Sequence, residues 1–180
     1  GRGGRNLELA QALAQGRRLR RRDRGFALSA ARSLIFNALL ARRVADGSWQ
    51  RLLPGDRAGL AGSRSHFAVE EIDIELQTRL ATHDVHPTGP LWGRGELPGA
   101  GAPAALEREV GRSLAPLDTL LEQAGLSQER RALRLLVEGL TWSWQAGALT
   151  LGFTLVAGGF ATAVLGALAG IRPGAPSVPG

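Results

Sequence analysis

The stretch SAARSLIFNALLARRV, residues 29–44, decides how this chain folds. Its apolar side chains recur every three or four residues, which is the spacing of one face of an α-helix. Ser29 has a side chain suited to the N-cap, and Gly47 is placed to end the helix. The sequence therefore predicts a helix that packs one face in the core. That face consists of Ile35, Phe36, Leu39, Leu40 and Val44.

Short helical and extended patterns lie on both sides of this helix. Upstream, residues 7–14 are rich in helix formers, with Asn6 suited to begin the helix and Gly16 to end it. Downstream, residues 66–69 predict a short strand and residues 71–80 a helix. Together these patterns indicate an α+β fold.

The second half of the chain begins with a segment rich in Gly and Pro, residues 87–103, where we expect little regular structure. Residues 104–112 and 117–123 then predict two short helices. Ser127 is suited to cap a further helix that runs to Leu136. The exposed positions of that helix hold Arg130, Arg131 and Arg134.

Residues 146–171 form a run of 26 residues without a charged side chain. A membrane-spanning helix needs roughly 20 such residues. Leucine and phenylalanine nevertheless occupy every second position from 149 to 155, which is the period of a strand. Gly158-Gly159 predicts a turn, and residues 160–168 predict a helix. We therefore expect a strand, a turn and a helix in a soluble core, with a membrane span as the alternative.

The composition of the 180 residues excludes several classes of active site. All 22 basic residues are arginine, and Lys, Cys, Met and Tyr are absent. Without Lys there is no Schiff-base lysine, and without Cys there is no disulfide, thiolate nucleophile or cysteine-ligated metal. Since no Met occurs, we expect a piece of a longer chain. No signal-peptide pattern opens the sequence.

Positive charge is concentrated at the start of the chain. The net charge of the whole chain is +6, but residues 1–43 carry 11 arginines against Glu8 and Asp23, a net charge of +9. Such a distribution predicts an anionic partner, which could be RNA, DNA or anionic lipid. The alternative is a solvated loop without a partner. The densest run consists of Arg17, Arg18, Arg20, Arg21, Arg22 and Arg24.

Few residues suggest catalysis or metal binding. His83 and His86 flank Asp84 at a spacing that matches no strong metal motif, so we expect surface or turn histidines. Two glutamate pairs, Glu70/Glu71 and Glu107/Glu109, stand where helices are expected to begin. There they would favour the helix dipole. We expect Trp142 and Trp144 to pack against other side chains of the protein rather than to stack on nucleic-acid bases.

Five segments resemble, in order, one known family. Residues 29–44 are similar to the Ser-x-x-Arg-Ser-x-x-Phe-Asn-x-x-Leu-Ala-x-Arg-Val helix of the TruD-type tRNA pseudouridine synthases. Residues 87–93 resemble that family's Pro-Thr-Gly-Pro-Leu-Trp-Gly segment, and residues 129–134 its Glu-x-Arg-Arg-Ala-x-Arg segment. Residues 160–165 resemble its Phe-Ala-Thr-x-Val-Leu segment. Residues 3–7 are similar to the segment that follows the family's Gln-Arg-Phe-Gly motif.

The resemblance implies an α+β architecture in which a TRUD insertion domain is attached to part of a pseudouridine-synthase catalytic domain. On this map, residues 13–138 are the insertion domain. Residues 1–12 and 139–171 belong to the catalytic domain, and residues 172–180 are a disordered tail.

The resemblance also implies a reaction. Enzymes of this family detach the uracil of uridine 13 in the tRNA D arm at its N1–C1′ bond and rejoin it through C5, without a cofactor. The family's nucleophilic Asp lies in a Gly-x-Lys-Asp segment that this chain lacks, because it has no Lys. We therefore expect the chain alone to be inactive. Phe160 matches the family residue that lines the uridine pocket.

The resemblance thus predicts a cytoplasmic, monomeric enzyme that acts on tRNA, with no metal, no small-molecule cofactor and no membrane contact. We expect the arginine run, residues 17–24, to bind tRNA phosphates. One alternative is a non-catalytic RNA-binding module. Another is a protein anchored in a membrane through residues 146–171.

Overall fold

The longest helix of the described part of the chain is α2 (Arg21–Ala45), and it begins nine residues earlier than the sequence predicts, because its N-cap is Arg20 and not Ser29. Ser29 is therefore an exposed residue inside the helix and not its cap. The apolar face extends back to Ala27 and Leu28, which are both buried, and this burial favours the longer helix. The predicted core residues Ile35, Phe36 and Leu39 are confirmed. Val44 is 52% exposed, so its assignment to the core is wrong.

The computed structural model describes residues 4–156 and 161–169. They fall into two compact units, Gly1–Arg134 and Leu135–Gly180, and each is described by itself. The expected disordered tail, residues 172–180, lies outside the described residues.

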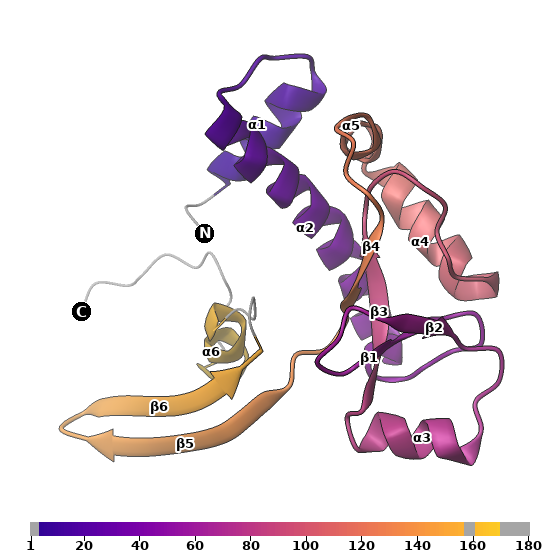
Figure 1. Cartoon of the computed structure of the whole chain (residues 1–180). Coiled ribbons are helices and arrows are strands. Elements are labelled where there is room, and N and C mark those ends of the chain that lie inside the picture. The colour runs from indigo at the N-terminus through magenta and orange to yellow at the C-terminus, as the bar shows by residue number, and fades with distance from the viewer. Residues whose placement is uncertain (1–3, 157–160, 170–180) are drawn as a thin grey trace. The chain divides into compact units, whose positions relative to one another are not determined.

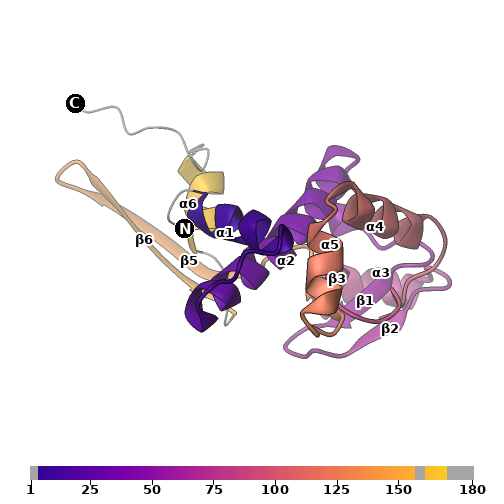
Figure 2. The same cartoon turned by 90° about the horizontal axis from the view of Figure 1, so that it is seen from above.

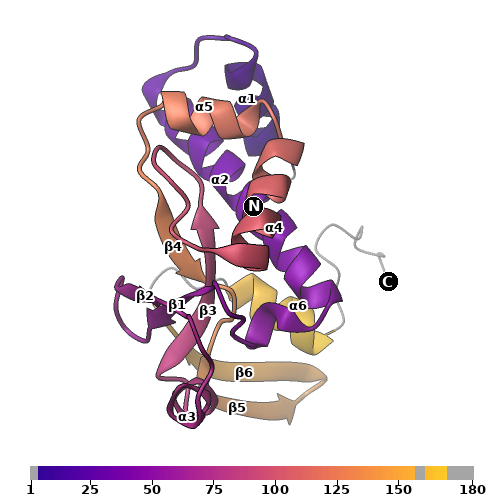
Figure 3. The same cartoon turned by 90° about the vertical axis from the view of Figure 1, so that its right-hand side faces the viewer.

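In the first unit, three helices pack on α2. Helix α1 (Arg5–Ala14) lies against α2 and α5 (Leu117–Gln123), and α4 (Gly101–Ser113) also contacts α2 (Figure 3). Helix α1 begins after Gly4 in the left-handed conformation, so Asn6 is not its cap, whereas Gly16 follows its end as predicted. The buried residues at this junction are Ala10, Ala27, Leu28, Ala31, Ile35, Trp92, Leu117 and Leu121.

The sheet of the first unit has four strands in the order β2-β1-β3-β4, and the paired neighbours are antiparallel (Figure 1). The predicted strand at residues 66–69 is confirmed as β2 (His66–Ala68), and it pairs with β1 (Arg57–Leu60). Helix α3 (Ile74–Ala81) is capped by Asp73, whose Oδ1 accepts a hydrogen bond from the Leu76 backbone N–H at 2.7 Å. A short 3₁₀ helix, η1 (Ser48–Gln50), follows α2. Leu76 of α3 belongs to a buried cluster that also contains Leu52, Ala58, Val69 and Val85.

Strand β3 (Val85–Leu91) occupies part of the segment that the sequence predicts to be irregular. Two prolines fit because each half of the strand pairs mainly with one neighbour. Its first half pairs with β1 at Pro87, and its second half pairs with β4 (Glu129–Ala132) at Pro90. The Pro87 carbonyl accepts a hydrogen bond from Leu133 N–H at 2.9 Å, so its carbonyl is satisfied although it has no N–H. The irregular prediction is therefore wrong for this segment.

Strand β4 also replaces the helix predicted from Ser127 to Leu136. Alternation along the strand turns Arg130 inward, and its side chain is only 3% exposed, although the sequence placed it at the surface. Long-range pairing with β3 thus overrides the local helical propensity of this segment.

Glycine allows the chain to pass closely around Trp92 after β3. A Cβ at Gly111 of α4 would overlap the Trp92 ring, and a Cβ at Gly93 would overlap the Leu126 carbonyl. The indole N–H of Trp92 donates to Glu122 Oε1 at 3.1 Å. These contacts fix the end of β3 between α4 and α5.

The second unit contains a two-stranded antiparallel ribbon of β5 (Val137–Gln145) and β6 (Ala148–Leu155), followed by α6 (Ala161–Ala169) (Figure 2). The predicted strand at 149–155 and the following helix are confirmed, while the predicted Gly158-Gly159 turn lies outside the described residues. Among the helices that the structure describes, none has the length and apolar character needed to cross a bilayer.

A buried ion pair joins β4 to α4 across β3. The Arg130 guanidinium donates to both carboxylate oxygens of Glu107, at 2.7 and 2.9 Å, and both side chains are 3% exposed. It also donates to the Thr88 carbonyl at 2.8 Å and to the Thr88 hydroxyl at 2.9 Å. Glu107 lies seven residues into α4, so its predicted role at the helix start is wrong.

We predict that Glu107→Ala lowers the free energy of unfolding by about 3–5 kcal/mol, because it leaves a buried guanidinium without its partner. Glu109 lies two positions away on α4 and pairs with Arg42 at 3.0 Å, but those side chains are 62% and 56% exposed. Glu109→Ala should therefore cost at most about 1 kcal/mol. Urea unfolding of both variants, followed by circular dichroism, measures the difference, and equal losses would contradict the assignment.

Candidate nucleic-acid interface

The six-arginine run surrounds the start of α2. Arg17, Arg18 and Arg20 lie between α1 and α2, while Arg21, Arg22 and Arg24 lie in the first turns of α2. All six side chains are exposed. Arg20 occupies the N-cap position of α2 and makes no side-chain cap hydrogen bond. Because the run lies at the N-terminus of α2, the positive end of the helix dipole adds to the arginine charges.

These arginines differ from four others that point into the first unit. Arg43 pairs with Asp56 in the core, and Arg32 donates to the backbone carbonyls of Leu91 and Trp92 at 2.9 Å. Arg130 and Arg134 make similar inward contacts. Within residues 4–156 and 161–169, no carboxylate lies within ion-pairing distance of any member of the run. Its guanidinium groups are therefore available to an external anion.

A groove of about 560 Å³ lies beside the run, between α1 and the start of α2. Two of its arginines, Arg20 and Arg22, belong to the run, and Arg5 comes from α1. The Arg22 guanidinium lies over the Phe26 ring, 5.6 Å from its centroid. The remaining lining residues are Asn6, Leu9 and Asp23.

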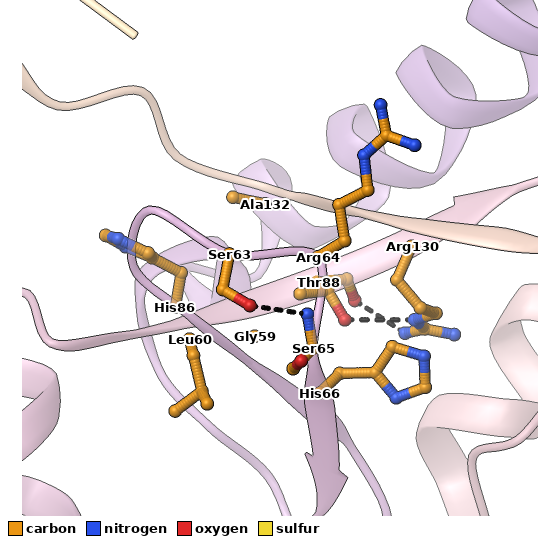
Figure 4. A pocket seen from close by; sticks show the side chains of 10 residues that line it. All are labelled: Gly59, Leu60, Ser63, Arg64, Ser65, His66, His86, Thr88, Arg130 and Ala132. Atoms are coloured by element: carbon orange, nitrogen blue, oxygen red, sulfur yellow. Dashed lines mark hydrogen bonds between the residues drawn. The ribbon is translucent and has the colours of Figure 1, made fainter.

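A second, smaller pocket of about 50 Å³ opens on the sheet near the β1–β2 turn (Figure 4). His66 and His86 line it, but their rings point in different directions and do not converge on one point. Ser63 Oγ accepts a hydrogen bond from Ser65 N–H at 2.9 Å, which holds the turn. In the described ranges, no cluster of three or more His, Asp or Glu could hold a metal ion.

Both histidines of this pocket accept hydrogen bonds from arginine. Arg134 Nε–H donates to His86 Nδ1 at 2.8 Å, and Arg57 Nε–H donates to His66 Nδ1 at 3.2 Å. A guanidinium nitrogen cannot accept, so each imidazole carries its proton on Nε2. Burial and the neighbouring guanidinium group lower the pKa of both histidines. For His86, His83 lowers the pKa further and Asp84 raises it.

The lowered pKa of His86 predicts a loss of stability in acid. The unfolded chain binds the proton more readily, so the contribution of neutral His86 is complete above about pH 6.5 and is lost as the pH falls toward its folded pKa. His86→Asn keeps an oxygen acceptor for Arg134 but does not titrate. We expect a shallower pH dependence of the unfolding free energy between pH 5 and 7.

The matched control for this prediction is His83→Asn. His83 is exposed and has a backbone φ of 64°, which Asn tolerates. Because His83 is a lesser cause of the lowered pKa of His86 than burial and Arg134, urea unfolding at several pH values should give this variant a pH dependence only slightly shallower than that of the unchanged chain. A His86→Asn variant with a pH dependence as steep as that of the unchanged chain would show that His86 does not contribute.

Of the site residues predicted from the sequence, the six arginines lie within the described residues and Phe160 does not. The arginine run is brought to one end of α2, but Phe160 lies outside the described residues. Sequence reasoning missed Arg5, Asn6 and Leu9 as neighbours of the run. A signal was present, because residues 5, 6 and 9 repeat the spacing of residues 22, 23 and 26, which places each set on one side of a helix.

An α+β unit with an exposed arginine cluster and an adjacent groove is typical of nucleic-acid-binding proteins. The family model for tRNA pseudouridine synthase D (TruD) matches residues 9–167 of the chain. The chain therefore belongs to the TruD family.

Curated relatives support this assignment. A "tRNA pseudouridine synthase D" of Pseudomonas putida (strain W619) is 47% identical over 176 residues, covering 96% of this chain and 50% of the relative. That of Pseudomonas entomophila (strain L48) is 49% identical over 164 residues, covering 91% of this chain and 45% of the relative. The chain thus spans about half the length of the curated relatives it matches.

A solved structure supports the fold. The crystal structure of a Methanosarcina mazei protein assigned as tRNA pseudouridine synthase D (TruD) matches with a TM-score of 0.58 and 21% sequence identity. The match covers 75% of this chain and 35% of that one. The α+β fold expected from the sequence is therefore confirmed.

Proposed function

We propose that this chain is part of a tRNA pseudouridine synthase and that it supplies much of the surface that holds the tRNA. Family membership and the names of the relatives support the enzyme class. The observation that carries the binding role is the run of six exposed arginines without carboxylate partners in the described residues.

The proposed reaction is the isomerisation of uridine 13 in the tRNA D arm to pseudouridine, in the cytoplasm and without a cofactor. The N1–C1′ bond of the uridine breaks, the uracil turns, and C5 bonds to C1′. The proposed nucleophile is an Asp outside this chain, in the part of the relatives that the match leaves uncovered. Phe160 is proposed to line the uridine pocket.

We also propose a division of labour along the chain. Residues 13–138 form the TRUD insertion domain, and residues 1–12 and 139–171 contribute to the catalytic domain. The arginine run then lies at the start of the insertion domain, next to the catalytic part in sequence. The intact enzyme is proposed to act as a monomer on tRNA.

Arginine suits the proposed tRNA contact because its planar fork donates two parallel hydrogen bonds to one phosphate. Six guanidinium groups close in sequence also repel one another, and a polyanion relieves that repulsion. If four to six phosphate contacts form, the logarithm of the tRNA affinity should fall against the logarithm of the salt concentration with a slope of about −3 to −5 from this run alone.

We predict that replacing all six arginines of the run by Gln removes this contribution to the slope. Since phosphates carry no base identity, the variant should bind all tRNAs more weakly by a similar factor. Fluorescence anisotropy with labelled tRNA across a salt series measures the slope. An unchanged slope would mean that the run is only a solvated surface.

A charge-matched control tests whether position matters or only net charge. Arg20→Gln/Arg22→Gln should make the slope less steep by about 1.4–1.8 if each guanidinium neutralises one phosphate. Arg108→Gln/Arg112→Gln removes the same charge from exposed positions on α4. The second pair should leave the slope nearly unchanged, and equal effects of the two pairs would argue against a local interface.

The catalytic part of the proposal predicts two activities. The chain alone should form no pseudouridine in tRNA. A chimaera in which this chain replaces the matching half of the Pseudomonas putida relative should convert uridine 13. Primer extension after carbodiimide treatment of the tRNA detects the product at single-nucleotide resolution.

The outcomes of the chimaera experiment separate the alternatives. Pseudouridine formed by the chain alone would place a nucleophile among its own acidic residues. A folded chimaera that binds tRNA without converting uridine 13 would instead favour a non-catalytic RNA-binding module.

A further inference from the structure

We infer that the groove between α1 and the start of α2 holds one unpaired nucleotide of a bound RNA. Its base stacks on the platform formed by Phe26 and Arg22, and its flanking phosphates meet Arg5 and Arg20. This inference rests on the proposed function, because it assumes that the partner is RNA. The proposed function describes this surface only as arginines that bind phosphates, and the inference adds a site for a single base.

The two helices present matching sets of side chains to the groove. Helix α1 contributes Arg5, Asn6 and Leu9, and α2 contributes Arg22, Asp23 and Phe26, each as a cation, a polar neighbour and an apolar residue one turn later. Residues at this spacing share one side of a helix. The groove therefore combines arginines with an apolar surface formed by Leu9 and Phe26.

Phe26 is an exposed aromatic residue that lines the groove. Its side chain is 46% exposed, while its neighbours Ala27 and Leu28 fill the core. The Arg22 guanidinium lies 5.6 Å from the ring centroid, so a planar cation and an aromatic ring form one surface. Bases that have left a helix stack on such rings and guanidinium planes.

Asp23 distinguishes this groove from a plain phosphate site. A carboxylate repels phosphate, but it accepts hydrogen bonds from the N–H groups of a base edge. Asn6 can both donate to and accept from a base edge. The arginines and these two side chains thus match the two halves of a nucleotide, its phosphate and its base.

The size of the groove agrees with one nucleotide. Its volume of about 560 Å³ lies within the range of about 300–1,000 Å³ typical of small-molecule sites. Paired bases within a duplex cover both of their faces and cannot reach Phe26. The groove should therefore favour single-stranded or looped RNA over a regular helix.

The test uses the full 180-residue chain and two probes, a fluorescein-labelled single-stranded RNA octamer and a fully paired RNA duplex containing the same sequence. Phe26→Leu should weaken octamer binding about tenfold and duplex binding less than twofold. Because no charge is lost, the salt slope should stay unchanged. Phe26→Trp should restore octamer binding, which a purely structural role of Phe26 would not require.

Phe67→Leu is the matched control. Arg79 lies 5.7 Å from the Phe67 ring centroid, so the variant removes the same kind of cation–aromatic pair outside the groove. It should leave octamer binding unchanged. Circular dichroism identifies a temperature at which every variant is folded, and all binding is measured there.

The outcomes separate this inference from the proposed function. If Arg20→Gln/Arg22→Gln reduces the tRNA salt slope but Phe26→Leu binds the octamer like the unchanged chain, the nucleotide site is wrong and the RNA interface stands. Equal losses on octamer and duplex, or no octamer binding by the unchanged chain, also overturn the site. If the arginine variants leave tRNA binding unaffected, the proposed interface itself fails.

Discussion

The first unit depends on the bidentate contact between Arg130 and Glu107. This contact links the outer strand β4 to α4. The same guanidinium also donates hydrogen bonds to the hydroxyl and the carbonyl of Thr88 in β3. The two prolines of β3 remove two backbone donors from the strand, and the donors of the Arg130 side chain add to the connection. The Trp92 ring against Gly111 then fixes the distance between β3 and α4.

The same side chain thus serves two purposes in this molecule. Pointing inward, Arg32, Arg43 and Arg130 connect helices to strands and loops through carbonyls and carboxylates. Pointing outward around the start of α2, guanidinium groups remain without carboxylate partners in the described residues. Direction of packing, and not residue type, decides whether an arginine stabilises the fold or is available to RNA.

How much the sequence predicts depends on whether an element is determined locally. The core positions Ile35, Phe36 and Leu39 of α2 and the alternation in β6 follow from side-chain periodicity, and these predictions are confirmed. Strands β3 and β4 could not be predicted in this way, because their pairing depends on residues such as Glu107 and Gly111, which are distant from them in sequence. Likewise, the sequence alone identifies the arginine run at the start of α2. That Arg5 and Asn6 lie beside the run follows only from the packing of α1 on α2.

Because every basic residue of this chain is arginine, and these arginines are divided between core and surface, reagents that modify guanidinium groups can report on both places. Dicarbonyl reagents such as phenylglyoxal modify accessible guanidinium groups, and no lysine is present to compete. In the folded chain the groups around the start of α2 are open to the reagent, whereas Arg43 and Arg130 become open only when the first unit unfolds locally. The rate at which each arginine is modified would therefore report two things: whether a bound partner covers the start of α2, and how often local unfolding exposes the buried arginines.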